Sequence, residues 1–331
     1  MTPPPDFASD FTAAPFAPAA VPVPTHPSDS TRARSAAAAI AADISRLTRP
    51  RIALMVLATV VASMWLTAGR GVGGPSLFWL LVGTTLVAAS SSIANQILER
   101  DADRLMPRTA RRPIAAGRLS VPAATMLATL LVAVGGLMIT LSSGWQAAAA
   151  AVATWILYVV VYTPMKMRSP LNTAVGAVSG ALPVAIGWLA ADGPQRLAAG
   201  DAAGALAVAA LGTVLYLWQF PHFMAIAWLY RSQYAAAGMR MLTVDDPSGL
   251  RAAGQALAAS LAMVPVSLVL AVPSGSIRLF LAAAIASLVY AVATVGFAVR
   301  RDDASARRLL FTSLGSLLVL LMASVMFGPP A

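Results

Sequence analysis

The chain has 331 residues, of which 58% are hydrophobic and 11% are charged. Soluble domains carry about 25% charged residues, so this composition excludes an ordinary soluble enzyme and a disordered regulator and indicates that lipid is the main solvent. The absence of cysteine excludes disulfides, thiolate nucleophiles and cysteine-ligated metals, and the net charge of +10 suits basic loops beside membrane spans better than a nucleic-acid partner.

The first 34 residues differ in composition from the rest of the chain. Eight of the 23 prolines lie within the first 27 residues, and no Lys or Arg precedes Arg32. A secretory signal would need a basic start and an apolar core, and a mitochondrial transit peptide would need scattered arginines. We therefore expect a disordered, Pro-rich cytosolic tail over residues 1–34, followed by one membrane domain over residues 35–331.

From residue 52 onward the chain consists of apolar segments of about 20 residues, the length at which a helix crosses about 30 Å of hydrocarbon. The segments are continuously apolar and do not alternate, which disfavours a β-barrel. We predict an all-α, polytopic membrane protein with nine transmembrane helices. The predicted helices cover residues 52–69, 76–98, 119–142, 146–163, 171–191, 204–229, 254–272, 279–298 and 309–327.

The distribution of basic residues predicts the orientation of these helices. Arg70, Arg196 and Arg278 fall in loops on one side, and the other 20 of the 23 Lys and Arg residues fall in the N-terminal region and in the loops on the opposite side. Cytoplasmic loops are enriched in Lys and Arg. We therefore expect a bacterial inner-membrane protein with its N-terminus in the cytoplasm and its C-terminus outside.

The end of the second predicted helix carries the most informative polar residues. Asn95, Glu99 and Asp103 follow one another at intervals of four, so on a helix they fall within about 80° of one another. Asp101 points elsewhere. One carboxamide and two carboxylates on one face, at the inner membrane boundary, are hard oxygen ligands that suit Mg²⁺.

Three arginines that follow this helix suit a phosphate group. Arg108, Arg111 and Arg112 could place bidentate donors against the phosphate oxygens of a metal-bound substrate. The alternative is a solvated loop in which the arginines simply pair with the acids. Acids at a membrane boundary are candidates for function, and this favours the metal and phosphate site.

The pattern of Asn95, Glu99 and Asp103, followed by Arg108 and Arg112, resembles the first aspartate-rich motif of the UbiA-type intramembrane prenyltransferases. The resemblance extends over about residues 43–327. It implies an all-α protein with nine transmembrane helices that binds an isoprenyl diphosphate through Mg²⁺. The family usually has Asp where this chain has Glu99, a change that keeps the charge and lengthens the side chain.

A basic turn joins the fourth and fifth predicted helices. It contains Tyr162, Lys166 and Arg168, and Lys166 is the only lysine of the chain. Taken alone, such a turn is usually a topology signal beside a helix-breaking proline. A similar turn in the family meets the diphosphate from the far side, so the resemblance implies that these three residues bind the substrate.

The sixth predicted helix contains Gln219 and His222 within the stretch Trp-Gln-Phe-Pro-His-Phe, and Tyr234 follows it. This stretch is similar to one in the protohaem IX farnesyltransferases, a group within the same family. The resemblance implies that the three residues bind substrate and that His222 contacts haem, as an iron ligand or as the partner of a propionate. The alternative is a buried neutral histidine bonded to a backbone carbonyl that Pro221 leaves free.

One position departs from the family pattern. The second acidic motif commonly has Asp before the tyrosine, where this chain has Gln233 before Tyr234. Glutamine can ligate a metal through its carbonyl oxygen but contributes no charge. Asp245 and Asp246 follow about a dozen residues later and could either substitute or be ordinary loop acids. The sequence therefore leaves a second metal site open.

The resemblance implies transfer of the farnesyl group of farnesyl diphosphate to the 2-vinyl group of haem b, with addition of water. The catalytic and metal-binding residues would be Asn95, Glu99 and Asp103, and the cofactor would be Mg²⁺. The expected partners are the two substrates, membrane lipid and a haem A synthase or oxidase assembly protein. Two alternatives are a UbiA-type transferase with an aromatic or quinone-precursor acceptor and a secondary transporter, whose spans are also interrupted by Gly and Pro.

Overall fold

A computed structural model describes residues 29–69 and 73–328, and all regular secondary structure in these two ranges is helical. Nine helical segments in this part of the chain are long and apolar enough to cross a membrane, which confirms the predicted class. They are α2 (Pro50–Ala68), α3 (Pro75–Leu98), α5 (Val121–Ser143), the segment Trp145–Met165 with α6 (Trp145–Ile156) at its start and α7 (Thr163–Met165) at its end, the pair α8 (Asn172–Ala181) and α9 (Pro183–Ala190), α11 (Ala202–Leu229), α14 (Leu250–Val269), α15 (Ile277–Arg300) and α16 (Asp303–Phe327).

Helix α1 (Asp29–Thr48) precedes the membrane segments. The chain divides after Ala41 into two units, so α1 begins in the first unit and ends in the second. Of the tail that we expect to be disordered, residues 1–28 lie outside the described ranges, and residues 29–34 are helical. The remaining short helices are α4 (Arg100–Arg104), α10 (Gly193–Ala198), α12 (Arg231–Ala236) and α13 (Leu242–Asp245).

Prolines and capping side chains set the first residues of several helices. Pro50 and Pro75 stand at the first helical position of α2 and α3, where a missing N–H costs no hydrogen bond. At the start of α16 the side chain of Asp302 accepts the N–H of Ser305 at 2.7 Å, and the side chain of Ser305 accepts the N–H of Asp302. This reciprocal capping box starts the last helix directly after α15.

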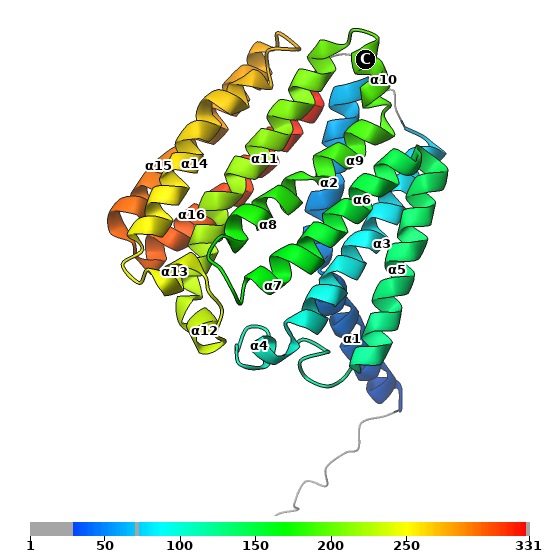
Figure 1. Ribbon diagram of the computed structural model, residues 1–331, viewed down its shortest axis with the longest axis vertical. Coiled ribbons are helices and arrows are strands. Elements are labelled where there is room, and N and C mark those ends of the chain that lie inside the picture. Colours follow the sequence, from blue (N-terminus) through cyan, green and yellow to red (C-terminus); the bar gives the residue numbers. More distant parts are fainter. Residues whose placement is uncertain (1–28, 70–72, 329–331) are drawn as a thin grey trace, which may run out of the picture. The chain divides into compact units, whose positions relative to one another are not determined.

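The membrane helices of the second unit pack in a continuous series of neighbours (Figure 1). Helix α3 packs on α5, α5 on α6, α6 on α9 and α9 on α2, and α11 packs on α2, α8, α14 and α16. The short helices α4, α7, α12 and α13 lie at one end of this bundle, at the bottom of Figure 1. The polar segments between the membrane helices therefore meet at that end.

Glycines allow direct backbone contact between neighbouring helices. A Cβ atom added to Gly135 would lie 2.6 Å from the carbonyl oxygen of Gly83, so α3 and α5 touch at this point. A Cβ added to Gly187 in α9 would collide with the carbonyl oxygen of Val60 in α2. Small residues at such crossings let helices approach closely inside a membrane.

The fourth membrane segment differs from the continuous α-helix that the sequence predicts. It consists of α6 (Trp145–Ile156), the π-helix η1 (Leu157–Tyr162) and α7 (Thr163–Met165). Pro164 has no N–H with which to continue the α-helical repeat, and both the N–H and the hydroxyl of Thr163 bond to the carbonyl oxygen of Tyr158. The wider turn directs side chains toward α3 and α8, and π-helical turns are frequent at functional sites.

The contact between α3 and α5 predicts the effect of adding one methyl group. We expect Gly135→Ala to lower the free energy of unfolding by about 1–3 kcal/mol, because the new Cβ forces the two backbones apart. Gly136→Ala is the matched control, since its added Cβ meets only a methyl of Val152 at 4.0 Å. Thermal unfolding of both purified variants in detergent measures the difference. Equal midpoints would contradict the contact.

Candidate functional site

The candidate site is built at the end of α3. The N–H of Glu99 bonds to the carbonyl oxygen of Asn95 at 2.9 Å, and the N–H of Asp103 bonds to that of Glu99 at 2.7 Å. The helical repeat thus continues from α3 into α4, and the three side chains share one face, as the spacing predicts. Asp101 lies apart from them, exposed and paired with Arg104 at 3.2 Å.

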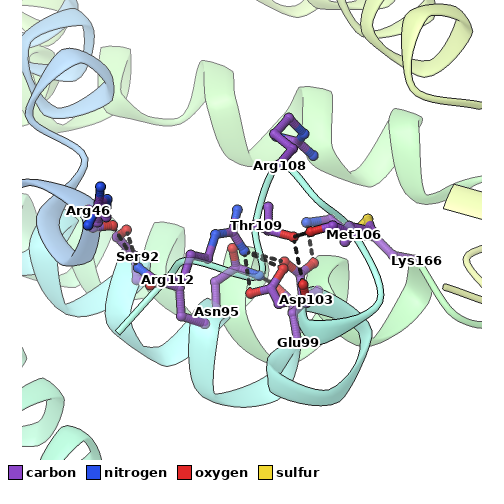
Figure 2. A network of polar contacts seen from close by, with 12 residues as sticks. Arg46, Ser92, Asn95, Glu99, Asp103, Met106, Arg108, Thr109, Arg112 and Lys166 are labelled. Atoms are coloured by element: carbon purple, nitrogen blue, oxygen red, sulfur yellow. Dashed lines mark hydrogen bonds and ion pairs between the residues drawn. The ribbon is translucent and has the colours of Figure 1, made fainter. Parts of the chain in front are cut away.

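Two basic side chains from other segments neutralise the carboxylates (Figure 2). Nη1 of Arg112 lies 2.6 Å from Oδ1 of Asp103 and 3.5 Å from Oε2 of Glu99. Nζ of Lys166 lies 2.7 Å from Oε1 of Glu99. Arg112 comes from the loop after α4, whereas Lys166 directly follows α7. The structure thus brings two of the predicted basic residues onto the predicted acidic face.

These polar side chains are withdrawn from solvent. Asn95 and Asp103 are fully buried, and Glu99 is 7% exposed. Burial alone would raise the pKa of the Glu99 carboxyl, but the charges of Lys166 and Arg112 hold that pKa below its usual value. Burial raises the pKa of the Asp103 carboxyl even though Arg112 opposes the shift. An additional cation at Asp103 would therefore favour its ionised form.

The amide of Asn95 completes a set of oxygen donors. Its Nδ2 donates to the hydroxyl of Thr163 at 3.4 Å, and the hydroxyl of Tyr158 donates to its Oδ1 at 3.5 Å, so the π-helical segment orients the amide. No group of three His, Cys, Asp or Glu side chains within residues 29–69 and 73–328 could hold a metal. A metal at this site would thus need the Asn95 oxygen beside the two carboxylates, a donor set that fits Mg²⁺.

Tyr162 supports the lysine of the site. Nζ of Lys166 lies 4.5 Å from the centre of the Tyr162 ring, a distance at which the aromatic face attracts a cation. Ring atoms Cδ2 and Cε2 fill the space beside Gly176 in α8, where an added Cβ would collide with them. The predicted residue therefore holds Lys166 in place and packs α8 against η1.

Arg108 lies against two tyrosines and has no ion pair with a carboxylate in the described part of the chain. Its guanidinium carbon lies 4.6 Å from the ring centre of Tyr230, and its Nη2 donates to the hydroxyl of Tyr234 at 3.4 Å. Arg108 thereby connects the loop after α4 with the end of α11. Arg111 and Arg168 are exposed. The five predicted basic residues therefore do not gather at one point.

Gln219 lies between α11 and α8. Its Nε2 donates to the carbonyl oxygen of Ala177 at 2.9 Å, and its side chain occupies the space that a Cβ of Gly180 would fill. This hydrogen bond of the Gln219 amide thus links α11 to α8. A contact between Gln219 and a substrate remains a prediction.

His222 faces α16. Its Nδ1 lies 2.7 Å from the hydroxyl oxygen of Ser313, and its ring stacks on that of Trp218 with the ring centres 4.6 Å apart. The bonded partner of the ring is thus a side chain and not the backbone carbonyl that Pro221 leaves free. The other ring nitrogen, Nε2, has no hydrogen-bond partner among the residues described.

The segment after α11 holds the position where the family pattern has an acid. Oε1 of Gln233 is buried and has no hydrogen-bond partner in the described ranges. Asp245 pairs with Arg240 at 3.1 Å, and Asp246 accepts the N–H of Arg251 at 2.8 Å at the start of α14. Both acids therefore have partners of their own in the loop, and neither forms a second carboxylate cluster within the described residues.

Arg49 also belongs to the site, although the stretch Arg49-Pro50-Arg51, which fits the same group as the Trp-Gln-Phe-Pro-His-Phe stretch, predicts no contact with the acids. Its Nη2 is buried and has no hydrogen-bond partner within the described residues. Its charge adds to the effect of burial in lowering the pKa of Arg112, and it assists Lys166 in lowering the pKa of Glu99. A basic residue at the start of the first membrane helix is usually a topology signal, so only the three-dimensional arrangement distinguishes it.

Comparison with known proteins identifies what this chain resembles. Residues 56–320 match the model of the UbiA prenyltransferase family. The chain is 41% identical over 276 residues to Protoheme IX farnesyltransferase of Rhodopirellula baltica, covering 81% of this chain and 93% of that protein. It is 36% identical over 282 residues to the protein of the same name from Solibacter usitatus, covering 82% of this chain and 94% of that one.

Solved structures support the fold at low sequence identity. A UbiA homolog from Archaeoglobus fulgidus bound to GPP and Mg2+ superimposes with a TM-score of 0.59 at 16% identity, covering 86% of this chain and 99% of that chain. A digeranylgeranylglyceryl phosphate synthase gives a TM-score of 0.70 at 13% identity, covering 86% and 97%. These values establish the shared helical architecture.

The two adjacent arginines of the loop predict different effects on stability. We expect Arg112→Gln to lower the free energy of unfolding by about 3–5 kcal/mol, because it leaves the buried Asp103 carboxylate without its cation. Arg111→Gln is the matched control and should change it by less than about 0.5 kcal/mol, since Arg111 is exposed. Thermal unfolding of both variants in detergent without ligands tests this. A midpoint for Arg112→Gln equal to that of the control would contradict the role of the ion pair.

Proposed function

The chain belongs to the UbiA prenyltransferase family, and we propose that it acts as a protohaem IX farnesyltransferase. In this reaction the bond between C1 of the farnesyl group and the diphosphate oxygen breaks, and C1 bonds to the terminal carbon of the 2-vinyl group of haem b. The hydroxyl of a water molecule adds to the other vinyl carbon, and the remaining proton is released. The products are haem O and diphosphate.

The observation that carries this proposal is the meeting of Asn95, Glu99 and Asp103 with Lys166 and Arg112 at one buried place. Departure of diphosphate concentrates negative charge on the leaving group, and preorganised cations in a dry site stabilise such charge strongly. Oxygen donors and cations side by side are what a metal-bound diphosphate needs. The names of relatives that share 36–41% identity over most of both chains support haem as the acceptor.

We assign Asn95, Glu99 and Asp103 as the residues that would hold Mg²⁺, and the Mg2+ bound to the UbiA homolog from Archaeoglobus fulgidus supports this assignment. The bound ion would supply charge stabilisation for the leaving diphosphate. Lys166 would donate to phosphate oxygens from the opposite side, while Arg112 orients the two carboxylates. The apolar helices would exclude water from the allylic cation until the vinyl group attacks it.

We further propose that His222 contacts haem through Nε2. Ser313 and the stacked Trp218 ring fix the orientation of the imidazole, which leaves the second nitrogen for an iron or propionate contact. The alternative is a histidine that only joins α11 to α16 through Ser313. Gln219 and Tyr234 would help to shape the substrate cavity as supports of α8 and Arg108.

The excess of Lys and Arg at the end of the bundle that carries Glu99 supports a cytoplasmic location for that end. The N-terminus would then lie in the cytoplasm, the C-terminus outside, and the chain in a bacterial inner membrane. Both proposed substrates have an apolar body and a charged end, which suits a site at the membrane boundary. A haem A synthase or oxidase assembly protein would receive the product.

Haem extraction tests the reaction as a whole. The chain is expressed in cells that make farnesyl diphosphate and haem b but lack haem O, and the haems are separated by hydrophobicity and identified by mass. A haem heavier than haem b by one farnesyl group (C15H25) and one hydroxyl group is expected. Unchanged haem b together with a prenylated aromatic acid or quinone precursor would instead support the aromatic acceptor. The absence of both prenylated products would favour a transporter.

Carboxylate substitutions test the metal and diphosphate site. We expect Asp103→Asn and Glu99→Gln each to reduce turnover at least about 100-fold, because each removes a charge worth on the order of 3 kcal/mol in the transition state. Asp101→Asn is the matched control, since Asp101 is exposed and faces away. Turnover is measured in membranes with equal protein levels. Near-normal activity of Asp103→Asn would exclude Asp103 as a metal ligand.

The role of His222 requires a paired measurement. We expect His222→Ala to weaken haem binding while leaving the affinity for farnesyl diphosphate nearly unchanged, because the two groups would contact different helices. Its effect on turnover should be smaller than that of Asp103→Asn. Ser313→Ala removes the helix contact but keeps the imidazole, so it should weaken haem binding less than His222→Ala does. Equal loss of both affinities, or of neither, would return His222 to a structural role.

A further inference from the structure

Arg49 stands at the junction between α1 and α2 in an unusual backbone conformation. Its φ of 48° and ψ of 63° lie in the left-handed region, which costs a residue with a Cβ atom about 1–2 kcal/mol. Its carbonyl oxygen nevertheless accepts the N–H of Ile52 at 2.9 Å and so starts α2. Strain of this kind persists where the surrounding structure imposes it, and it is concentrated at functional sites.

The end of α1 is fastened beside the carboxylate face of α3. Nε2 of the fully buried Gln96 donates to the carbonyl oxygens of Arg46 and Leu47 at 3.1 and 3.0 Å. Gln96 precedes Glu99 by three residues, so the junction lies within one helical turn of the site. Asp43 adds a two-point ion pair with Arg118, with both distances 2.7 Å. These contacts hold the backbone that carries Arg49 in place.

The side chain of Arg49 gives the site more positive than negative charge. The charges of Arg49, Arg112 and Lys166 all act on the Glu99 carboxylate, and Arg112 also pairs with Asp103, so three cations accompany two carboxylates. Arg112 and Lys166 each have an ion pair with them, whereas Nη2 of Arg49 is buried without a hydrogen-bond partner within the ranges described. A buried donor without a partner is costly, and a buried charge normally has a counter-ion. This donor is therefore available to an anionic group from outside the chain.

We propose that Arg49 is a substrate-binding residue whose Nη2 donates to an anionic oxygen, a phosphate or carboxylate oxygen of one of the two substrates. This inference rests on the proposed function, since farnesyl diphosphate carries phosphate oxygens and haem b carries propionates. The α1–α2 junction thereby becomes part of the site. The contrasting role is purely structural, in which Arg49 only balances the charge of Glu99.

Binding measurements on the full purified chain in detergent distinguish these roles without requiring turnover. Arg49→Gln is compared with Arg51→Gln, a matched control two residues along in α2 whose side chain is exposed. Affinity for inorganic diphosphate with Mg²⁺ is measured by calorimetry. Affinities for haem b and for its dimethyl ester, which lacks the propionate charges, are measured by optical titration.

We expect Arg49→Gln to weaken the binding of one of the two anions, inorganic diphosphate or haem b, at least about tenfold, as for loss of a charge-assisted hydrogen bond. The affinities of Arg51→Gln should stay within about twofold of those of the wild type. A loss confined to inorganic diphosphate assigns the phosphate. A loss confined to haem b, with the dimethyl ester unaffected, assigns a propionate. Arg49→Lys should retain part of the affinity, because it keeps the charge but not the planar donors.

Two results would overturn the proposal. Unchanged affinity for both anions would show that Nη2 meets neither substrate. A loss of both affinities accompanied by a lowered ligand-free thermal midpoint would establish the structural role, whereas the proposal expects that midpoint to stay within about 2 °C, because Nη2 has no partner to lose. Failure of the proposed function is a separate outcome, since it would appear as absence of haem O in the wild type.

Discussion

The carboxylates of Glu99 and Asp103 are buried at one end of an apolar helix bundle, and buried ionised groups are stable only with counter-charges. Arg112 bonds to Asp103 and lies near Glu99, and Lys166 bonds to Glu99. Because these cations come from a loop and from a turn far along the chain, neutralising the acids also fixes how the α3 end, the loop after α4 and the turn after α7 come together. The same constraint that allows the acids to be buried therefore builds a site for a polyanion.

The backbone around this cluster is irregular where the side chains must converge. The π-helix directs Tyr158 and Thr163 to the Asn95 amide. The left-handed junction at Arg49 brings a third cation to the carboxylate face. Glycines elsewhere let the membrane helices pack in direct contact. This packing stabilises the fold enough to hold the strained backbone conformation at Arg49. We propose that this arrangement serves to separate diphosphate from its farnesyl group away from water.

The fold and the acidic face were predictable from the sequence, because both depend on local periodicity. Hydropathy locates the membrane helices, and the four-residue spacing places Asn95, Glu99 and Asp103 together. Which of the arginines pair with the buried carboxylates was not predictable, since neighbours such as Arg111 and Arg112 differ only in tertiary environment. The only feature of the sequence that could have indicated the π-helix is Pro164, and a proline is equally consistent with an ordinary helix kink. The burial of Arg49 depends on contacts between distant segments, and sequence spacing carries no record of them.

The central claim is tested most directly by a crystal structure of the full chain with Mg²⁺ and a farnesyl thiodiphosphate, an analogue whose carbon–sulfur bond does not break readily. We expect a diphosphate group between the Glu99 and Asp103 carboxylates and the Lys166 ammonium, with the ion on the carboxylate side and the farnesyl chain among the apolar helices. A diphosphate bound elsewhere, with both carboxylates still paired only to Arg112 and Lys166, would contradict it.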